Sequence, residues 1–146
     1  MAYLSDEEFY SIYSKVPRLT VDLLIQNEKG TLLALRSIEP YLGEWHMPGG
    51  TVYKEETIEE AAVRIAKREL GLTVSAKKSI GHMEFPNEMR AGNNIHTISI
   101  VVPVEILEGE LQHDEGAEEL CWFVNMPENT IFQHKKFLMD LKSASQ

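Results

Sequence analysis

Residues 50–72, GTVYKEETIEEAAVRIAKRELGL, decide the fold of this chain. Thr57 followed by Glu60 is a capping box, which predicts that a helix begins after Thr57. Gly71 is a typical residue just past a helix end, so the helix is expected to stop there. The apolar residues between these points share one helical face: Ile58, Ala61, Ala62 and Ile65. The segment is therefore predicted to be a loop followed by an amphipathic helix.

Glu69 borders the apolar face of this helix. On an ideal helix it lies about 40° from Ile65 and about 20° from Ile58, so its carboxylate needs a partner. The loop before the helix contains Gly49 and Gly50, whose backbone approaches a ligand closely because it lacks side chains. We expect Glu69 and a backbone carbonyl of this loop to bind one divalent cation together with phosphate oxygens. Mg2+ suits few protein contacts, and Mn2+ is the alternative.

Glu56 and Arg64 are the other charged residues that this segment singles out. Glu56 lies just ahead of the helix, and Arg64 lies two turns along it. An ion pair that fixes the loop to the helix is one interpretation, and a direct catalytic role is the other. The spacing leaves both open.

The composition describes one globular domain. The chain has 146 residues, 43% of them hydrophobic, enough for one core. A formal net charge of -9 disfavours nucleic acid or an anionic membrane surface as partner. The single cysteine, Cys121, forms no internal disulfide and is typical of a reducing cytoplasm. No leader pattern and no apolar run of about 18 residues indicates export or membrane spanning.

The remaining elements are predicted from apolar runs and turn residues. A capping box at Ser5 and Glu8 predicts a helix within residues 1–16, whose aromatic and apolar residues indicate a homodimer. Residues 37–50, with two prolines and three glycines, are expected to be loop. Strands are expected at 19–26, 31–36, 72–85, 95–106 and 119–124, the first two joined as a hairpin, and a final helix at 131–141. This order indicates an α+β fold with a mixed sheet.

Five residues of the segment stand at the spacings of a known motif. Gly50, Glu56, Arg64, Glu69 and Gly71 match the Nudix box, G-x5-E-x7-R-E-U-x-E-E-x-G-U with U apolar. The chain therefore resembles the Nudix hydrolase superfamily. The resemblance implies a single Nudix domain over residues 1–146, an α/β/α sandwich with a mixed β-sheet, and a small-molecule nucleoside diphosphate derivative as partner.

Two departures from the box indicate which branch of the superfamily the chain resembles. Ile65 and Arg68 stand where the box has its first two glutamates after the arginine. A similar departure occurs in the GDP-mannose mannosyl hydrolase branch, which the chain also resembles in LSDEEF, VDLLIQN, YLGEWHMPGG and RELGL. In that branch water attacks the sugar carbon and GDP leaves, with Mg2+ on the diphosphate. The resemblance implies a nucleotide-sugar substrate such as GDP-mannose.

The branch also implies residues that bind the substrate. By matching positions, Gly50 and Glu69 would bind the metal. Arg36 would contact phosphate, and Asp22 would contact the nucleotide or the sugar. His96 matches a histidine in a comparable strand, although a hydrogen-bonded strand histidine is the alternative. The branch has an arginine after its Pro-Gly-Gly, where this chain has Thr51.

The general base stays open at this point. The branch carries a Gln-His pair before its tryptophan-containing strand, and a gapless alignment on Trp122 places Gly116 and Ala117 there. Gln112 and His113 form such a pair four residues earlier, so a loop shift makes His113 one candidate. The carboxylates of the same loop are the others, since some Nudix enzymes recruit a glutamate from this region: Glu115, Glu118 and Glu119.

Two further functions remain alternatives to a nucleotide-sugar hydrolase. One is ordinary Nudix chemistry, in which water attacks phosphorus in a nucleoside diphosphate derivative or a nucleoside triphosphate. The other is a nucleotide-binding domain that has lost catalysis, which the departures at Thr51, Ile65 and Arg68 suggest.

Overall fold

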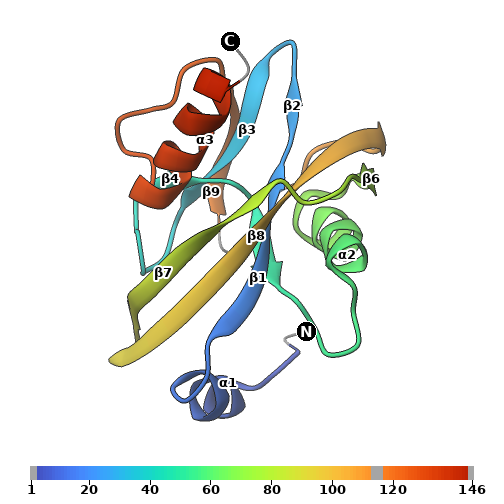
Figure 1. Ribbon diagram of the computed structural model, residues 1–146. Coiled ribbons are helices and arrows are strands. Elements are labelled where there is room, and N and C mark those ends of the chain that lie inside the picture. Colours follow the sequence, from blue (N-terminus) through green and yellow to red (C-terminus); the bar gives the residue numbers. More distant parts are fainter. Residues whose placement is uncertain (1–2, 113–116, 145–146) are drawn as a thin grey trace.

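Two β-sheets and three helices make up the part of the chain that the structure, a computed structural model, describes: residues 3–112 and 117–144 (Figure 1). In chain order the elements are α1 (Asp6–Tyr13), β1 (Arg18–Leu24), β2 (Gln26–Asn27), β3 (Gly30–Arg36), β4 (Trp45–His46), β5 (Gly49–Thr51), α2 (Ile58–Leu70), β6 (Thr73–Ala76), β7 (Gly81–Arg90), β8 (Asn93–Glu108), β9 (Ala117–Phe123) and α3 (Phe132–Ala144).

The larger sheet is mixed, as predicted. Its order is β5-β1-β8-β6, and β7 also pairs with β8. Strand β1 runs parallel to β8, from Arg18 opposite Thr97 to Leu24 opposite Pro103. The pairs of β1 with β5 and of β8 with β6 and β7 are antiparallel. The parallel pair places Arg18, at the start of β1, beside Thr97 in the first part of β8, where the candidate site lies.

The smaller sheet corrects the predicted hairpin of residues 19–26 and 31–36. Its order is β2-β3-β4 with β9 on the other edge of β3, so only the two residues of β2 pair with β3. Strand β1 ends at Leu24, and the chain crosses to the smaller sheet at Ile25. Both edges of β1 are already occupied by β5 and β8. A continuous buried apolar run does not reveal where a chain changes sheets, because every residue is buried on either side of the change.

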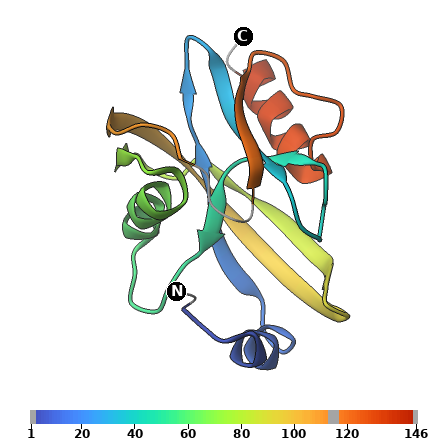
Figure 2. The ribbon, with the colours of Figure 1, turned by 180° about the vertical axis from the view of Figure 1, so that it is seen from behind.

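Residues 37–50 are also more ordered than the prediction of loop. They contain β4 and the start of β5, which pairs with β1 at Asp22 opposite Gly49. A Cβ at Gly49 would collide with the Asp22 side chain and the Val21 carbonyl. The glycine therefore allows two strands to approach closely, rather than making only a turn. Strand β5, teal in Figure 2, leads into the loop before α2.

The polar stretch 86–94 was expected to separate two strands, but it belongs to the β7–β8 ribbon. The ribbon turns at Ala91 and Gly92, which both have positive φ, and a register shift lies between Phe85 and Glu88. Polar residues fit there because alternate side chains of the ribbon face solvent.

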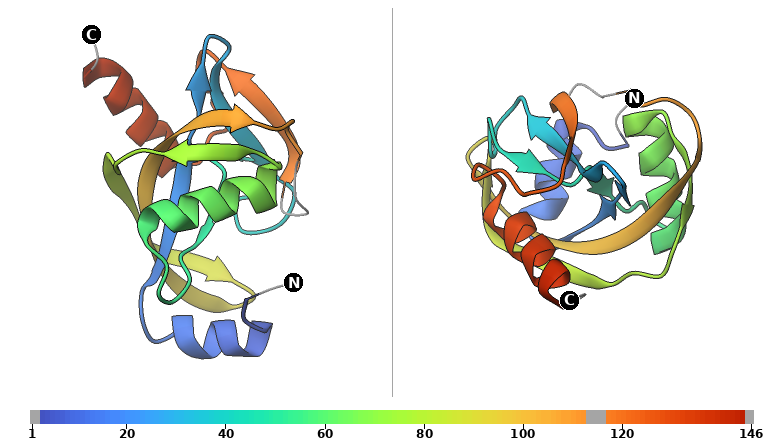
Figure 3. Two further views of the ribbon diagram at one scale, coloured as in Figure 1. Left: turned by 90° about the vertical axis from the view of Figure 1, so that its right-hand side faces the viewer. Right: turned by 90° about the horizontal axis from the view of Figure 1, so that it is seen from above.

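Helix α2 begins and ends where the sequence predicts. Thr57 and Glu60 form the reciprocal capping box, and Gly71 closes the helix with φ of 71°. Its apolar face packs on the larger sheet in a core that includes Ile65 and Leu70. Helix α3 covers a second core on the other side of the strands, and Figure 3 shows the two helices flanking them. The α+β sandwich is confirmed.

Candidate active site

A cleft of about 320 Å³ opens where α1, β5 and α2 meet. Its wall on the larger sheet includes Gly49 and Gly50, and α2 supplies Glu69. Four arginines also line it: Arg18, Arg36, Arg64 and Arg68. A concentration of guanidinium groups in a chain of net charge -9 suits a phosphorylated ligand, because arginine binds phosphate oxygens with paired N–H donors.

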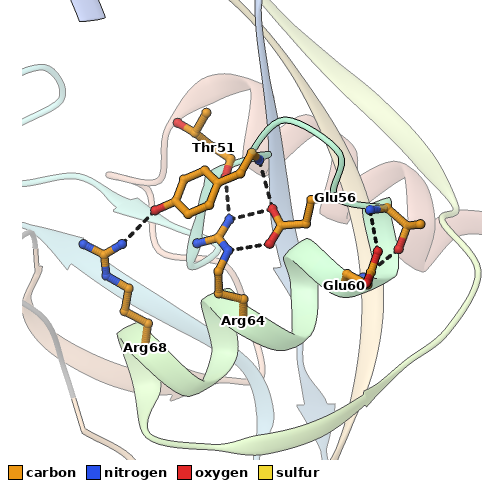
Figure 4. Close-up of polar contacts among 7 residues, drawn as sticks. Thr51, Glu56, Glu60, Arg64 and Arg68 are labelled. Atoms are coloured by element: carbon orange, nitrogen blue, oxygen red, sulfur yellow. Dashed lines mark hydrogen bonds and ion pairs between the residues drawn. The ribbon is translucent and has the colours of Figure 1, made fainter. Parts of the chain in front are cut away.

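Glu56 and Arg64 form the ion pair that the sequence left as one of two interpretations. Arg64 Nε donates to Glu56 Oε2 at 2.6 Å, and Arg64 Nη2 donates to Glu56 Oε1 at 3.0 Å (Figure 4). Arg64 Nη2 also donates to the Thr51 carbonyl at 2.7 Å, and the Tyr53 N–H donates to Glu56 Oε1 at 2.9 Å. The hydrogen bond from Arg64 lowers the pKa of Glu56. The network ties β5 and its loop to α2.

Tyr53 extends this network across the mouth of the cleft. The Arg64 guanidinium lies 3.6 Å from the centre of the Tyr53 ring, and Arg68 Nη1 donates to the Tyr53 hydroxyl at 2.8 Å (Figure 4). Tyr3 stacks on the same ring with centroids 4.0 Å apart. One ring therefore positions two arginines and the N-terminal segment together.

The donors in the cleft fit one small, hard cation. Glu69 is half-buried in the last turns of α2, opposite the backbone of Gly49 and Gly50. Ile65, where the box has a glutamate, is 1% exposed and packs towards Gly50. Among the described residues no group of three or more histidine, cysteine, aspartate and glutamate residues is placed to hold a metal. Mg2+ tolerates such a sparse protein shell, because water and phosphate oxygens complete its coordination.

A second cavity of about 110 Å³, which we name the polar pocket, continues from the cleft into the protein. The two share Arg18, Arg36, Gly49 and Gly50. The inner wall of the polar pocket is formed by residues from both sheets and from α3: Asp22, His46, Glu88, Arg90, Thr97 and His134.

Asp22 is a buried acid of the polar pocket. Ser99 Oγ donates to Asp22 Oδ2. Burial raises the pKa of Asp22 to about 7, against the opposing effects of the Ser99 hydrogen bond and the nearby Arg18. Burial and the neighbouring Arg90 lower the pKa of Arg18 to about 10. Arg18 and Asp22 lie on the same strand, β1, and an even number of residues separates them, so both side chains point to the same face of the sheet.

The structure brings most of the predicted site residues to the cleft or to the polar pocket, but not His96. Gly50, Glu69, Arg64 and Arg36 line the cleft, and Arg36 and Asp22 line the pocket. His96 faces a separate small hollow formed with residues 13–17, Pro86 and Asn94. Along β8 the side chains alternate, so His96 points away from Thr97.

Of the four candidates for the general base, only Glu119 has a described side chain, which is exposed on β9, and Glu115 lies outside the described residues. His113 lies outside the described residues. Glu118 belongs to β9, whose description does not extend to that side chain. The Gln112 N–H donates to the Leu70 carbonyl at 2.7 Å, so the segment that leads to His113 passes the end of α2.

Sequence reasoning missed Arg18, Glu88, Arg90 and Thr97 as site residues. A signal for Thr97 exists in the alternation of β8, where Ile95, Thr97 and Ser99 share the buried face. Polar residues on a buried face are uncommon and mark a network or a site. Arg18 Nε donates to Thr51 Oγ1 at 3.0 Å, so the Arg18 guanidinium lies directly beside Thr51.

Comparisons with known proteins show the family of this chain. Residues 16–140 match the NUDIX domain family model. The low-salt glycan biosynthesis protein Agl8 of Haloferax volcanii is 34% identical over 123 residues, which cover 82% of this chain and 79% of that protein. The ADP-ribose pyrophosphatase of Methanocaldococcus jannaschii is 35% identical over 136 residues, which cover 92% of this chain and 78% of that protein.

A solved structure shares the fold. The MutT protein of Methanosarcina mazei superimposes with a TM-score of 0.77 at 24% identity, over 89% of this chain and 96% of that one.

Proposed function

This chain belongs to the Nudix hydrolase family, and we propose that it is a Mg2+-dependent hydrolase of a nucleotide sugar. GDP-mannose is the best candidate for that substrate. The family assignment already makes it an enzyme that hydrolyses nucleoside diphosphate derivatives. The sugar, the base and the ion are the parts that we propose.

One observation carries the proposal: the arginine-lined cleft that contains Glu69 continues into the polar pocket. A diphosphate needs the cations and the Glu69–Gly50 donors of the cleft. The group attached to that diphosphate then reaches the polar pocket. A triphosphate without an attached polar group would leave the pocket unused.

The residues of the cleft have separable roles in this reaction. Glu69 and the Gly50 carbonyl would hold Mg2+, which when bound neutralises charge on the diphosphate. Arg36 and Arg68 would contact phosphate oxygens, and Arg18 would replace the cation that is missing at Thr51. Glu56 and Arg64 would act as positioning residues, because their ion pair fixes β5 to α2.

The bond changes follow from attack at the sugar carbon. The water oxygen forms a bond to the anomeric carbon as the bond from that carbon to the diphosphate oxygen breaks. The electron pair leaves with the nucleoside diphosphate, and a base removes a proton from the water. His113 and Glu118 remain our candidates for that base.

The relatives support a sugar-bearing substrate and also a second candidate function. One relative is named for glycan biosynthesis, and the other is named an ADP-ribose pyrophosphatase. The second name favours attack at phosphorus as the alternative reaction, which would release a mononucleotide. Among the described residues, Glu69 is the one carboxylate that lines the cleft, and this favours attack at carbon because it leaves fewer donors for several metal ions.

Hydrolysis in 18O-labelled water with Mg2+ separates these reactions. The panel would contain nucleotide sugars, ADP-ribose and nucleoside triphosphates, with the label located by mass spectrometry. We expect 18O on the free sugar and none on the nucleoside diphosphate. Label on a phosphate would establish attack at phosphorus. Absence of any product would support a binding domain without catalysis.

Replacement of Glu69 by glutamine tests the metal assignment. We expect Glu69→Gln to lower kcat about 1,000-fold, since loss of the cation removes several kcal/mol of charge stabilisation. Circular dichroism and thermal unfolding would check the fold. Glu59→Gln, on the exposed side of the same helix, is the matched control and should retain wild-type kcat. Full activity of Glu69→Gln would remove the metal assignment.

We further infer a cytoplasmic homodimer. No helix in the described part of the chain has the length and apolar character to cross a membrane. Near α1, Ile12, Val16 and Leu19 are each more than two-fifths exposed, which suits a contact with a second copy. Sedimentation equilibrium would test this, and a monomer at micromolar concentration would contradict it.

A further inference from the structure

Five buried polar atoms converge on the polar pocket without a partner. Among the described residues, the buried side-chain nitrogen and oxygen atoms with no hydrogen bond inside the protein are Arg36 Nη2, His46 Nε2, Glu88 Oε1, Arg90 Nε and Thr97 Oγ1. All five of these residues line this one cavity. Glu88 and Thr97 are only 6% and 4% exposed. Their convergence marks the pocket as a place for a polar ligand.

Unpaired buried polar atoms lower the stability of the folded protein. A buried polar atom left unpaired costs about 1–3 kcal/mol, and roughly nine in ten such atoms are paired in folded proteins. Here the atoms come from four strands, β3, β4, β7 and β8, that belong to both sheets. Because residues far apart in the sequence meet at one cavity, a ligand that pairs with them explains the group as a whole.

The hydrogen-bonding role of each atom follows from its chemistry. Arg36 and Arg90 only donate, and the Glu88 carboxylate only accepts. His46 Nδ1 lies 2.8 Å from the Met47 carbonyl and therefore donates to it. Burial lowers the pKa of His46 to about 4, so the ring is neutral and its Nε2 accepts. The Thr97 hydroxyl does both.

A polyhydroxylated ring matches this mixture of donors and acceptors, because every hydroxyl both donates and accepts. A phosphate has no proton for the Glu88 carboxylate or for His46, and the Glu88 carboxylate would repel it. A nucleobase carries its polar atoms in one plane between two apolar faces. The polar atoms of the pocket come from both sheets and would meet those faces.

The polar pocket also has the right position. It shares Arg18, Arg36 and the two glycines with the cleft, so a group joined to a diphosphate in the cleft enters it directly. We propose that the polar pocket is the sugar subsite, in which Glu88, Arg90 and Thr97 select the sugar by its hydroxyl pattern. The proposal rests on the proposed function for the presence of a nucleotide sugar.

Calorimetric titration without divalent cation tests the subsite independently of turnover. GDP-mannose and GDP would be titrated into the wild type, Thr97→Val and Glu88→Gln in EDTA. We expect Kd for GDP-mannose to rise about tenfold in Thr97→Val, and more in Glu88→Gln, where a charge-assisted bond is lost. Kd for GDP should stay unchanged. Equal weakening for both ligands, or none, would overturn the assignment.

Thermal unfolding distinguishes recognition from a structural role. Since the Thr97 hydroxyl is unpaired within the protein, Thr97→Val should leave Tm unchanged or raise it by about 2–4 °C. Thr31→Val is the matched control, because the buried Thr31 hydroxyl accepts from Gln26 Nε2 at 2.9 Å. That control should lower Tm and leave both affinities unchanged. A lower Tm in Thr97→Val would mean that its hydroxyl serves the fold.

Measurements of binding and of turnover together distinguish failure of the subsite proposal from failure of the proposed enzymatic function. If the protein binds GDP-mannose through Thr97 but never hydrolyses it, the proposed enzymatic function is wrong and the subsite stands. If it hydrolyses GDP-mannose while Thr97→Val and Glu88→Gln bind it normally, the function stands and the subsite is wrong.

Discussion

The cleft beside α2 and the polar pocket behind it use the same kinds of side chain but pair them differently. In the cleft, Glu56 accepts from Arg64 and from the Tyr53 backbone, and Arg64 also bonds to the Thr51 carbonyl. In the pocket, the Glu88 and Arg90 side chains each keep a buried atom without a protein partner. The first arrangement holds a loop in place, whereas the second is prepared to hold something else.

This difference separates stability from recognition within one site. Paired charges contribute to folding where they are partly buried and well aligned, while unpaired ones oppose it. The comparison therefore predicts that substitutions in the ion pair lower stability. Substitutions among the unpaired groups should preserve or raise it.

The largest expected effect on stability is at the ion pair. Glu56→Gln should lower the free energy of unfolding at pH 7 by about 2 kcal/mol, since hydrogen bonds to charged groups contribute about 1.5–3 kcal/mol. Urea unfolding would measure it, with the exposed Glu59→Gln as control. An unchanged unfolding midpoint would show that the pair does not fix the loop.

The same pair predicts a pH dependence. The pKa of Glu56 is lower in the folded protein than its ordinary value of 4.5, because Arg64 bonds to the ionised form. Its contribution is therefore present above pH 4.5 and is lost as the pH falls through the folded pKa. The gap between wild type and Glu56→Gln should narrow towards pH 3, and a constant gap would contradict this.

Asp22 should show the opposite sign and a smaller effect. Its folded pKa, about 7, is above its ordinary value of 3.8, so the stability it contributes is present below pH 3.8 and is lost as the pH rises through 7. Asp22→Asn should therefore have a higher midpoint temperature of unfolding than the wild type at pH 8. The difference should vanish near pH 4. A less stable Asp22→Asn at pH 8 would contradict the raised pKa.

The smallest effect on stability is expected at Arg68. Its side chain lies at the exposed mouth of the cleft and donates to the Tyr53 hydroxyl. Arg68→Met should change the free energy of unfolding by less than about 0.5 kcal/mol, as is usual at exposed positions. If Arg68 contacts phosphate, KM for the substrate should rise. Steady-state kinetics would check this, and an unchanged KM would exclude that contact.

The sequence predicts the cleft better than the pocket because the cleft is encoded locally. Thr57, Glu60 and Gly71 set the limits of α2 through bonds to nearby backbone atoms, so a short pattern suffices. The spacing of Glu56 and Arg64 in the sequence allowed two interpretations, and one of them was the ion pair that the structure shows. These relationships span few residues and need no knowledge of the rest of the fold.

The polar pocket depends on contacts between distant segments. Arg36, Glu88 and Thr97 meet only because β3 and the β7–β8 ribbon belong to different sheets that face the same cavity. The crossing between sheets at Ile25 was itself missed, since the surrounding apolar run is buried on both sides. Polar residues in strands resemble solvent-facing positions until the register is known.

Steady-state kinetics on the hydrolysed nucleotide sugar most directly tests whether chemistry and recognition lie in separate regions. Wild type, Glu69→Gln and Thr97→Val would be compared under the same Mg2+ concentration. We expect Glu69→Gln to lower kcat about 1,000-fold. We expect Thr97→Val to raise KM about tenfold with kcat nearly unchanged. A Thr97→Val variant that lowers kcat without changing KM, or a Glu69→Gln variant with normal kcat, would contradict it.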